Sequence, residues 1–262
     1  MRSSWADYKE ADTGVFFPVK HINYAGTTLD EQSLYLTIPR DKKNLPLVIF
    51  FHGGGFTHSA RECPRDLFNG DFAVAEVRYR LSQTKPAPAA MEDAAKAIAW
   101  CFGHAEEYGI DRKCIFAGGM SAGAYLAAIT VLKPSFLAPY NLSAKDIAGL
   151  PLISGQMTTH FHVKHDLDRD NGRYKPLIDE YAPFSYFAAD LPPILLVTGD
   201  SERDIPARPE ENAFAAASLK AMGHKFVRFY SLQGHGHVEC FCSCGQLLMR
   251  FLNDVLKARS DQ

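Results

Sequence analysis

The chain has 262 residues, of which 47% are hydrophobic, and a formal net charge of −2 at pH 7. A chain of this length can bury a large core and lies near the upper limit of one α/β domain, so we expect a single domain over residues 1–262. Because the charge is nearly balanced and forms no block of one sign, we expect a small-molecule substrate, with neither nucleic acid nor an anionic membrane as a partner.

The first half of the chain predicts three kinds of element. The short segment 19–24 and the alternating pattern at 33–38 are typical of two strands, and the turn-rich segment between them predicts an antiparallel hairpin. Continuous apolar runs at 47–51 and 72–79 are typical of parallel strands buried on both faces. Apolar residues at three- and four-residue spacing predict a helix over 91–108.

Strands and helices continue to alternate in the second half. Further strands are expected at 114–117, 148–153, 194–198 and 226–231, and further helices at 122–132, 209–222 and 246–257. This alternation predicts an open, mostly parallel α/β sheet. The segment 154–190 interrupts it, because it is polar, aromatic and too long for an ordinary connection. We expect an insertion that forms a lid or a wall of the binding pocket; the alternative is a surface excursion without function.

The pentapeptide G-M-S-A-G at 119–123 lies between the strand at 114–117 and the helix at 122–132. A strand, a glycine-flanked serine and a helix in direct succession predict a nucleophile elbow, in which Ser121 points out of the end of the sheet. Small residues around the serine, including Gly118 and Ala124, let strand and helix approach each other.

A serine hydroxyl is a poor nucleophile at neutral pH, so it needs a positioned base and an anion that orients that base. The loop after the strand at 226–231 offers His235 and His237. We prefer His237, because the G-x-G-H spacing gives a flexible approach. Three carboxylates follow the strand at 194–198 within one short loop, namely Asp200, Glu202 and Asp204.

A glycine run follows the strand at 47–51 and has a separate task. Attack on an ester carbonyl creates an oxyanion, which backbone N–H groups must stabilise. We expect these donors from Gly54, Gly55 and Ala122. A phosphate-binding loop is disfavoured, because neither a G-x-G-x-x-G nor a following G-K-[ST] pattern is present.

These segments together resemble the esterase/lipase branch of the α/β-hydrolase family, which includes hormone-sensitive-lipase-like esterases and bacterial acetyl- and feruloyl-esterase-like enzymes. The segments that carry the resemblance are H-G-G-G-F at 52–56, Y-R-L at 79–81, P-A-A-M-E-D at 88–93, Y-G-I-D at 108–111, G-M-S-A-G at 119–123, P-P at 192–193, T-G-D at 198–200 and G-H-G-H at 234–237. The resemblance implies an α/β-hydrolase fold, with antiparallel strands at the N-terminal end of a mostly parallel sheet and helices on both faces.

The resemblance also assigns the catalytic roles. In this family the acid usually lies three residues after the strand-end glycine, in a pattern like G-x-x-D-x-x-x-P. Counted from Gly199, this spacing implies that Glu202 is the acid, with Asp200 and Asp204 as alternates. Glutamate is a departure, since aspartate is commoner. The resemblance places the base at His237, with His235 as its alternate.

The predicted function is therefore hydrolysis of small carboxylic esters through an acyl-enzyme, without cofactor or metal, by a monomer or homodimer. The acyl group is expected to be short or aromatic, and carbohydrate is one candidate alcohol. Specificity is expected to reside in Phe56, Met120, Tyr125 and the 154–190 insertion. Two alternatives stay open, an amidase or peptidase of the same fold (arylformamidase-like) and a catalytically silent binding module.

Weaker patterns are interpreted as structural. The His and Cys residues at 235–244 lack the C-x-x-C form of a zinc site, and the acidic residues Asp166, Asp168 and Asp170 lack the glutamate that ends a calcium loop. The chain has no apolar run of transmembrane length, and residues 1–7 lack the apolar core of a signal peptide. Six cysteines do not form a disulfide scaffold, so we expect a cytoplasmic protein without integral membrane association.

Overall fold

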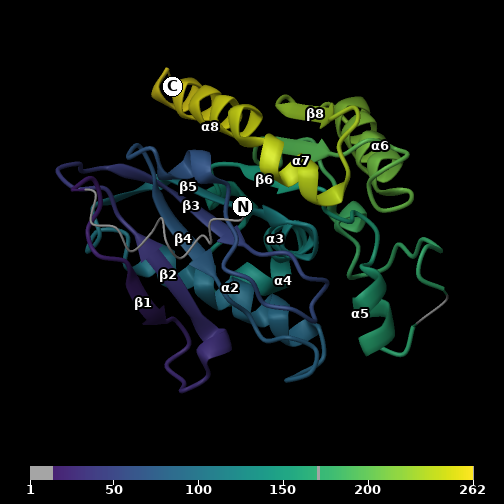
Figure 1. The fold of residues 1–262 in the computed structure, drawn as a ribbon, viewed down its shortest axis with the longest axis horizontal. Coiled ribbons are helices and arrows are strands. Elements are labelled where there is room, and N and C mark those ends of the chain that lie inside the picture. The colour runs from purple at the N-terminus through teal and green to yellow at the C-terminus, as the bar shows by residue number, and fades with distance from the viewer. Residues whose placement is uncertain (1–13, 170–171, 262) are drawn as a thin grey trace.

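A computed structural model describes residues 14–169 and 172–261. Residues 1–7 and Asp170, considered above, lie outside the described residues. An eight-stranded sheet in the order β1-β2-β4-β3-β5-β6-β7-β8 crosses the molecule (Figure 1). Its strands are β1 (Lys20–Asn23), β2 (Ser33–Thr37), β3 (Leu45–Phe51), β4 (Ala73–Val77), β5 (Ile110–Met120), β6 (Leu150–Ile153), β7 (Ile194–Thr198) and β8 (Val227–Ser231).

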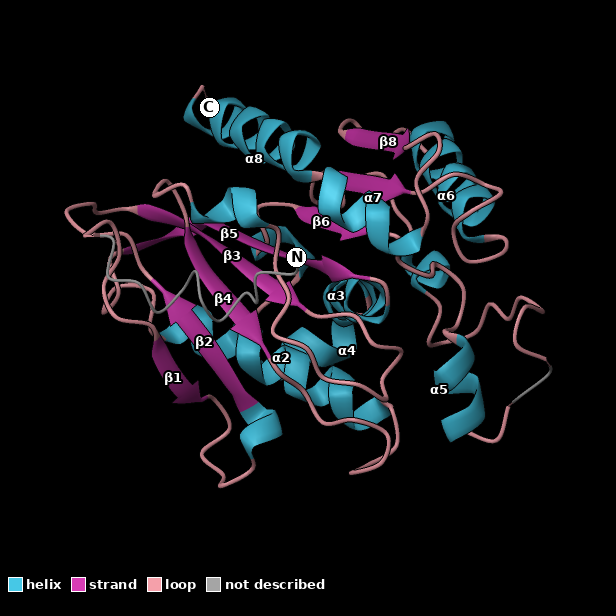
Figure 2. Cartoon of the chain, viewed as in Figure 1, coloured by secondary structure: helices cyan, strands magenta, loops and turns pink. Residues whose placement is uncertain are grey.

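The sheet is mixed only at its N-terminal end. β1 pairs antiparallel with β2, and β2 pairs antiparallel with β4. All other neighbours are parallel. Figure 2 shows the strands following one another from β1 at one edge to β8 at the other. The predicted hairpin and the predicted mostly parallel sheet are therefore confirmed.

Helices cover both faces of this sheet, as the side chains of β3 illustrate. Leu47, Ile49 and Phe51 belong to one buried cluster, which includes residues of α2 (Pro88–Gly103), α3 (Ala122–Leu132) and α6 (Arg208–Ala221). Val48 and Phe50 belong to a second cluster, with α7 (His237–Ser243) and α8 (Gly245–Ser260). A strand that faces a core on both sides needs apolar residues at every position, which explains the continuous run.

Several bounds differ from the sequence predictions; β5, for example, runs over Ile110–Met120, beyond the predicted 114–117. β3 begins at Leu45, so Pro46 lies inside the strand, where the register with β5 shifts between Leu45 and Leu47. α2 ends at Gly103, and the chain continues in turns to Gly109. α7 was not predicted; it begins at His237, immediately after β8 and its loop.

The 154–190 segment contains two short helices, α5 (Phe161–Asp166) and the 3-10 helix η5 (Pro183–Tyr186). α5 lies at the periphery of the molecule, away from the sheet (Figure 1). The lid or pocket-wall role of the segment stays a prediction, as do the single domain and the location in the cell.

In the described part of the chain, no single helix has the length and apolarity needed to cross a membrane. Among residues 14–169 and 172–261, α3 taken with Pro134–Tyr140 reaches that threshold as a pair, across a bend of 81°.

Candidate active site

Ser121 lies between the end of β5 and the start of α3, in a backbone conformation that is rare for residues other than glycine (φ 54°, ψ −117°). Such a conformation is strained and persists only where the surrounding structure enforces it. Its N–H donates to the Ile153 carbonyl at 2.8 Å, which ties the serine to the end of the neighbouring strand β6. The predicted strand–serine–helix turn is present.

Close packing around this turn explains its glycines. A Cβ added at Gly123 would overlap the carbonyl oxygens of Phe51 and His52, and one at Gly119 would lie 2.6 Å from the Gly123 carbonyl carbon. A Cβ at Gly118 would lie 2.6 Å from Cγ of Pro151 on β6. α3 therefore crosses the ends of the central strands at a distance that only glycine permits.

The His237 ring is held by Asp204 at the carboxyl end of the sheet. Nδ1 of His237 lies 2.6 Å from Oδ1 of Asp204, whose side chain is fully buried. The contact assigns the proton to Nδ1 and leaves Nε2 free to accept one. His237 is the first residue of α7, so the helix fixes the point where its side chain leaves the backbone.

Asp204 is an acceptor at several contacts. The N–H of Gly199 donates to its Oδ2 at 2.8 Å and the N–H of Ile205 to its Oδ1 at 2.7 Å. Burial alone would raise the pKa of Asp204, but the hydrogen bonds from His237, Gly199 and Ile205 outweigh it, and the pKa is lowered. The carboxylate is therefore charged at neutral pH.

Glu202, the acid implied by the family spacing, is not beside His237. It is exposed, and its backbone N–H donates to Oδ1 of Asp200 at 2.9 Å. The reason for this correction is the turn at 200–204, where the N–H groups of Arg203 and Asp204 both donate to the Asp200 carbonyl. This turn carries the chain outward at Glu202 and returns it to the sheet at Asp204.

The two alternates have other contacts. Asp200 accepts the N–H of Gly234 at 2.8 Å, and its own N–H donates to the His235 carbonyl at 2.7 Å. It thus joins the loop after β7 to the loop that carries His237. The hydrogen bonds from Gly234 and Glu202 lower the pKa of Asp200. The His235 ring contacts the Gln233 carbonyl and lies partly exposed.

Ser154 is a site residue that the sequence analysis missed. Its hydroxyl lies 2.9 Å from Oδ2 of Asp204 and 3.0 Å from Nδ1 of His237. It is fully buried, at the end of β6, and has a positive φ of 46°. The N–H of Ser121 is hydrogen-bonded to Ile153, which directly precedes Ser154 in the chain. Ser154 therefore connects the end of the site that holds Ser121 to the end that holds His237. No motif or residue spacing identifies such a serine in the sequence. Its position directly after a buried strand is a weak signal.

The glycine loop after β3 presents unbonded donors. Gly54 and Gly55 have positive φ values of 103° and 61°. Within the described residues, no hydrogen bond is made by the N–H groups of Gly54, Gly55 or Ala122. The loop itself is fixed, since the Gly54 carbonyl accepts from Thr57 and His58 at 3.0 Å. Free N–H donors on a fixed backbone are what an oxyanion requires.

His52 and Glu62 flank this loop. Nδ1 of His52 lies 2.6 Å from the Gly53 carbonyl, and the ring stacks on Tyr79 at 4.4 Å. Burial lowers the pKa of His52 to about 4, so this histidine is neutral at pH 7. Glu62 accepts the N–H of Gly53 at 3.2 Å, and burial raises its pKa.

The three side chains expected to line the substrate pocket lie in the core. Phe56 and Tyr125 are fully buried and Met120 is 4% exposed. Phe56 and Tyr125 meet edge to face at 6.0 Å, and both contact the buried ring of His160. Their part in specificity stays a prediction.

His160 is almost completely buried, with 1% of its surface exposed. Its pKa is well below the usual value because it is buried. Within residues 14–169 and 172–261, no three His, Cys, Asp or Glu side chains gather in a metal-binding group.

Comparison with known sequences connects part of this site to esterases. A family model described as BD-FAE matches residues 34–138. Esterase LipI of Mycobacterium tuberculosis is 34% identical over 119 residues, which are 43% of this chain and 34% of that protein. Carboxylic ester hydrolase LipN of the same organism is 41% identical over 91 residues, or 32% of this chain and 24% of that protein. The chain thus spans about a third or less of the length of these curated relatives.

Solved structures share the fold over almost the whole chain. A truncated form of a carbohydrate esterase from gut microbiota has a TM-score of 0.76 at 19% identity and covers 92% of this chain and 97% of its own. Thermogutta terrifontis esterase 2, solved phosphoramylated by tabun, has a TM-score of 0.74 at 22% identity and covers 90% and 94%. These likenesses confirm the fold that was predicted from the sequence.

Proposed function

We propose that this chain, which belongs to the esterase/lipase branch of the α/β-hydrolase family, hydrolyses carboxylic esters of small molecules through an acyl-enzyme. The observation that carries the proposal is the contact of 2.6 Å between His237 and the buried, charged Asp204. Ser121, in its strained turn, is hydrogen-bonded to Ile153, the residue before Ser154, and the Ser154 hydroxyl contacts both members of that pair. A buried carboxylate on Nδ1 of a histidine is needed where the imidazole must become cationic during a reaction.

The proposed reaction has two steps. Oγ of Ser121 attacks the ester carbonyl carbon while Nε2 of His237 accepts its proton, and the carbonyl oxygen becomes an oxyanion. The N–H groups of Gly54, Gly55 and Ala122 stabilise that oxyanion. Collapse of the tetrahedral intermediate breaks the bond to the alcohol, which leaves with the proton from His237. A water molecule then releases the acid by the same sequence, with His237 as its base.

The matched relatives support this chemistry in their names, because one is an esterase and another a carboxylic ester hydrolase. The BD-FAE match over residues 34–138 includes Gly54, Gly55 and Ser121 and ends before Asp204 and His237. We propose short or aromatic acyl groups. The likeness to a carbohydrate esterase supports carbohydrate as one alcohol.

Wild type and three variants test the proposal with 4-nitrophenyl butyrate as substrate. Ser121→Ala is expected to lose activity by a factor of about 10⁴ or more, since the nucleophile is removed. Asp204→Asn is expected to lose about 10³- to 10⁴-fold in kcat, because the imidazolium is no longer stabilised. Glu202→Gln is the matched control and should keep the wild-type rate within about twofold, because its side chain is exposed.

A fluorophosphonate probe separates an enzyme from a silent binding module. Only an activated serine reacts with such a probe, so wild type should be labelled at Ser121 and Ser121→Ala should not. The reported modification of the Thermogutta esterase by tabun supports the choice of probe. Full turnover by Ser121→Ala would contradict the proposal, and so would a large loss in Glu202→Gln with none in Asp204→Asn.

A further inference from the structure

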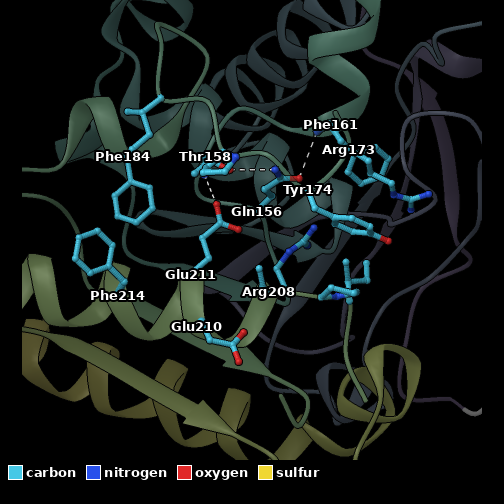
Figure 3. Close-up of a pocket in the computed structure, with 15 residues that line it drawn as sticks. Gln156, Thr158, Phe161, Arg173, Tyr174, Phe184, Arg208, Glu210, Glu211 and Phe214 are labelled. Atoms are coloured by element: carbon cyan, nitrogen blue, oxygen red, sulfur yellow. Dashed lines mark hydrogen bonds between the residues drawn. The ribbon is translucent and has the colours of Figure 1, made fainter. Parts of the chain in front are cut away.

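A cavity of about 400 Å³ lies between the 154–190 segment and the first turns of α6. Its walls are mostly aromatic and aliphatic (Figure 3). Phe161, Tyr174 and Phe184 come from the segment, and Phe214 comes from α6. The rings of Phe184 and Phe214 meet at 5.5 Å on the side opposite Phe161 and Tyr174. The volume is in the range of small-molecule sites, which are usually apolar with a few polar groups that fix the ligand.

One of these polar groups is a buried cation, Arg208. Its side chain lines the cavity, yet the residue is only 2% exposed. Figure 3 shows the guanidinium extending from α6 into the space beside Tyr174. One N–H group of Arg208 donates to the carbonyl of Ser154. Within the described residues the guanidinium group makes no other hydrogen bond and has no carboxylate within ion-pair distance.

A buried cation of this kind is costly unless an anion accompanies it. Burial lowers the pKa of Arg208, with Glu211 and Asp204 acting in the opposite direction. Asp204 is already bonded to His237. Glu211 accepts the N–H groups of Met157, at 3.0 Å, and Thr158. Both nearby carboxylates therefore have partners of their own.

The rim of the cavity adds one charge of each sign. Arg173 is exposed and lies over the Phe161 ring, with 4.4 Å between the guanidinium carbon and the ring centroid. Glu210 is exposed on α6. Glu211 also lines the cavity, but its carboxylate already accepts two backbone N–H groups. Arg208 is therefore the buried charged side chain that has hydrogen-bond donors left for a ligand.

We propose that this cavity binds a small aromatic carboxylic acid, with the carboxylate on Arg208 and the ring among Phe161, Tyr174, Phe184 and Phe214. Arginine presents several N–H donors in a planar fork that matches a carboxylate. The ligand is either a free acid, as an ester hydrolase would release, or a carboxylate carried by the ester itself. Arg208 also donates to the carbonyl of Ser154, and the hydroxyl of Ser154 contacts Asp204. Ser154 is therefore the single residue between the cavity and the Asp204–His237 contact.

Calorimetric titration of the full chain tests the site directly, with 3-phenylpropanoate and its uncharged analogue 3-phenylpropanamide as probes. Ser121→Ala protein is used as well as wild type, so that the result does not depend on turnover. The acid is expected to bind at least about tenfold more tightly than the amide, because a charge-assisted hydrogen bond replaces a neutral one. Equal affinities for acid and amide would overturn the proposal.

Variants show whether Arg208 causes the preference. Arg208→Gln should abolish the ratio between acid and amide, and Ile178→Glu, which places a negative charge on an exposed wall residue, should do the same without touching the Ser154 carbonyl. Lys220→Gln removes one positive charge from the exposed surface of α6 and should keep the ratio. Thermal unfolding identifies any variant that fails to fold. A ratio that survives in both Arg208→Gln and Ile178→Glu would overturn the assignment.

Kinetics with paired esters distinguish the two sources of the acid. A preference in kcat/KM for 4-nitrophenyl hydrogen glutarate over 4-nitrophenyl pentanoate that disappears in Arg208→Gln would identify a carboxylate-bearing substrate. The absence of that preference, together with tight binding of 3-phenylpropanoate, would identify a free acid. Both results support the carboxylate site. If wild type hydrolysed none of the esters, the proposed function would be contradicted, and the titration would still test the site.

Discussion

At the scale of single residues, Ser154 combines a strained backbone with a full set of contacts. Its N–H donates to the Val197 carbonyl at 2.6 Å, its carbonyl accepts from Arg208, and its hydroxyl lies 3.1 and 2.9 Å from the two oxygens of Asp204. A positive φ at a fully buried serine is held in place by such contacts. We infer that Ser154 is a positioning residue that fixes the carboxylate.

Two substitutions separate the hydroxyl of Ser154 from its backbone. Ser154→Ala and Ser154→Gly both remove a hydrogen bond to a charged group, worth about 1.5–3 kcal/mol, so kcat should fall about tenfold or more in both with little change in KM. Glycine accepts a positive φ without strain, so Ser154→Gly should unfold at a higher temperature than Ser154→Ala. Steady-state kinetics and thermal unfolding measure the two effects. Wild-type kcat in Ser154→Ala would contradict the positioning role.

The position of Asp204 beside His237 illustrates the limit of sequence reasoning at this scale. The sequence placed three carboxylates at the end of the correct strand, and the structure brings one of them to His237. The choice among the three carboxylates depends on a turn closed by two hydrogen bonds to the Asp200 carbonyl. No sequence motif specifies how many residues that turn contains. Ser121, His237 and the glycines could be named from spacing, because strand ends and close packing restrict them.

At the scale of elements, the crossing of β5, α3 and β3 decides the geometry of the candidate site. Gly123→Ala would place a methyl group onto the carbonyls of Phe51 and His52, which are backbone atoms that cannot rotate away. We expect a loss of stability of at least about 3 kcal/mol, since overpacking adds to backbone displacement, with loss of activity. The matched control is Gly103→Ala at the end of α2, where an added Cβ meets nothing within 4 Å.

The control should move in the opposite direction. Gly103 ends a helix with open space around it, so Gly103→Ala is expected to stabilise the chain by about 0.5–1 kcal/mol. Urea unfolding followed by circular dichroism compares both variants with wild type. Equal stabilities for Gly123→Ala and Gly103→Ala would show that α3 can move away from β3 without cost.

Elements with strong patterns could be predicted, and elements fixed by tertiary contacts could not. β3 and α8 have continuous or periodic apolar residues that identify them. α7 covers only seven residues and includes three polar or charged side chains among cysteines, so its sequence resembles a loop. The 154–190 segment has buried residues such as Lys164, whose ammonium donates to the carbonyls of Gly172 and Lys175. Contacts of this kind have no signal in a hydrophobic pattern.

At the scale of the whole molecule, buried neutral histidines make stability depend on pH. His52 is 2% exposed, and burial holds its pKa at about 4, compared with an ordinary value of 6.5. Between these two values the unfolded chain binds a proton at this residue and the folded chain does not. The free energy of unfolding therefore falls as pH decreases from 6.5 to about 4, and below that range the folded chain also takes up the proton.

The contribution of His52 can be measured by comparing how much stability wild type and His52→Gln each lose between two pH values. Between pH 7.5 and pH 5 the free energy of unfolding should fall by about 2 kcal/mol through His52 alone, as follows from its two pKa values at about 1.4 kcal/mol per unit. His52→Gln removes the titrating ring, so its stability should fall by about 2 kcal/mol less than that of wild type over the same range. Comparison within each protein cancels any general destabilisation by the substitution. His58→Gln, at an exposed position in the same loop, should keep the wild-type dependence on pH. If His52→Gln and wild type lose the same stability between pH 7.5 and pH 5, His52 is not a neutral histidine of the core, and the rigid glycine loop must be explained without it.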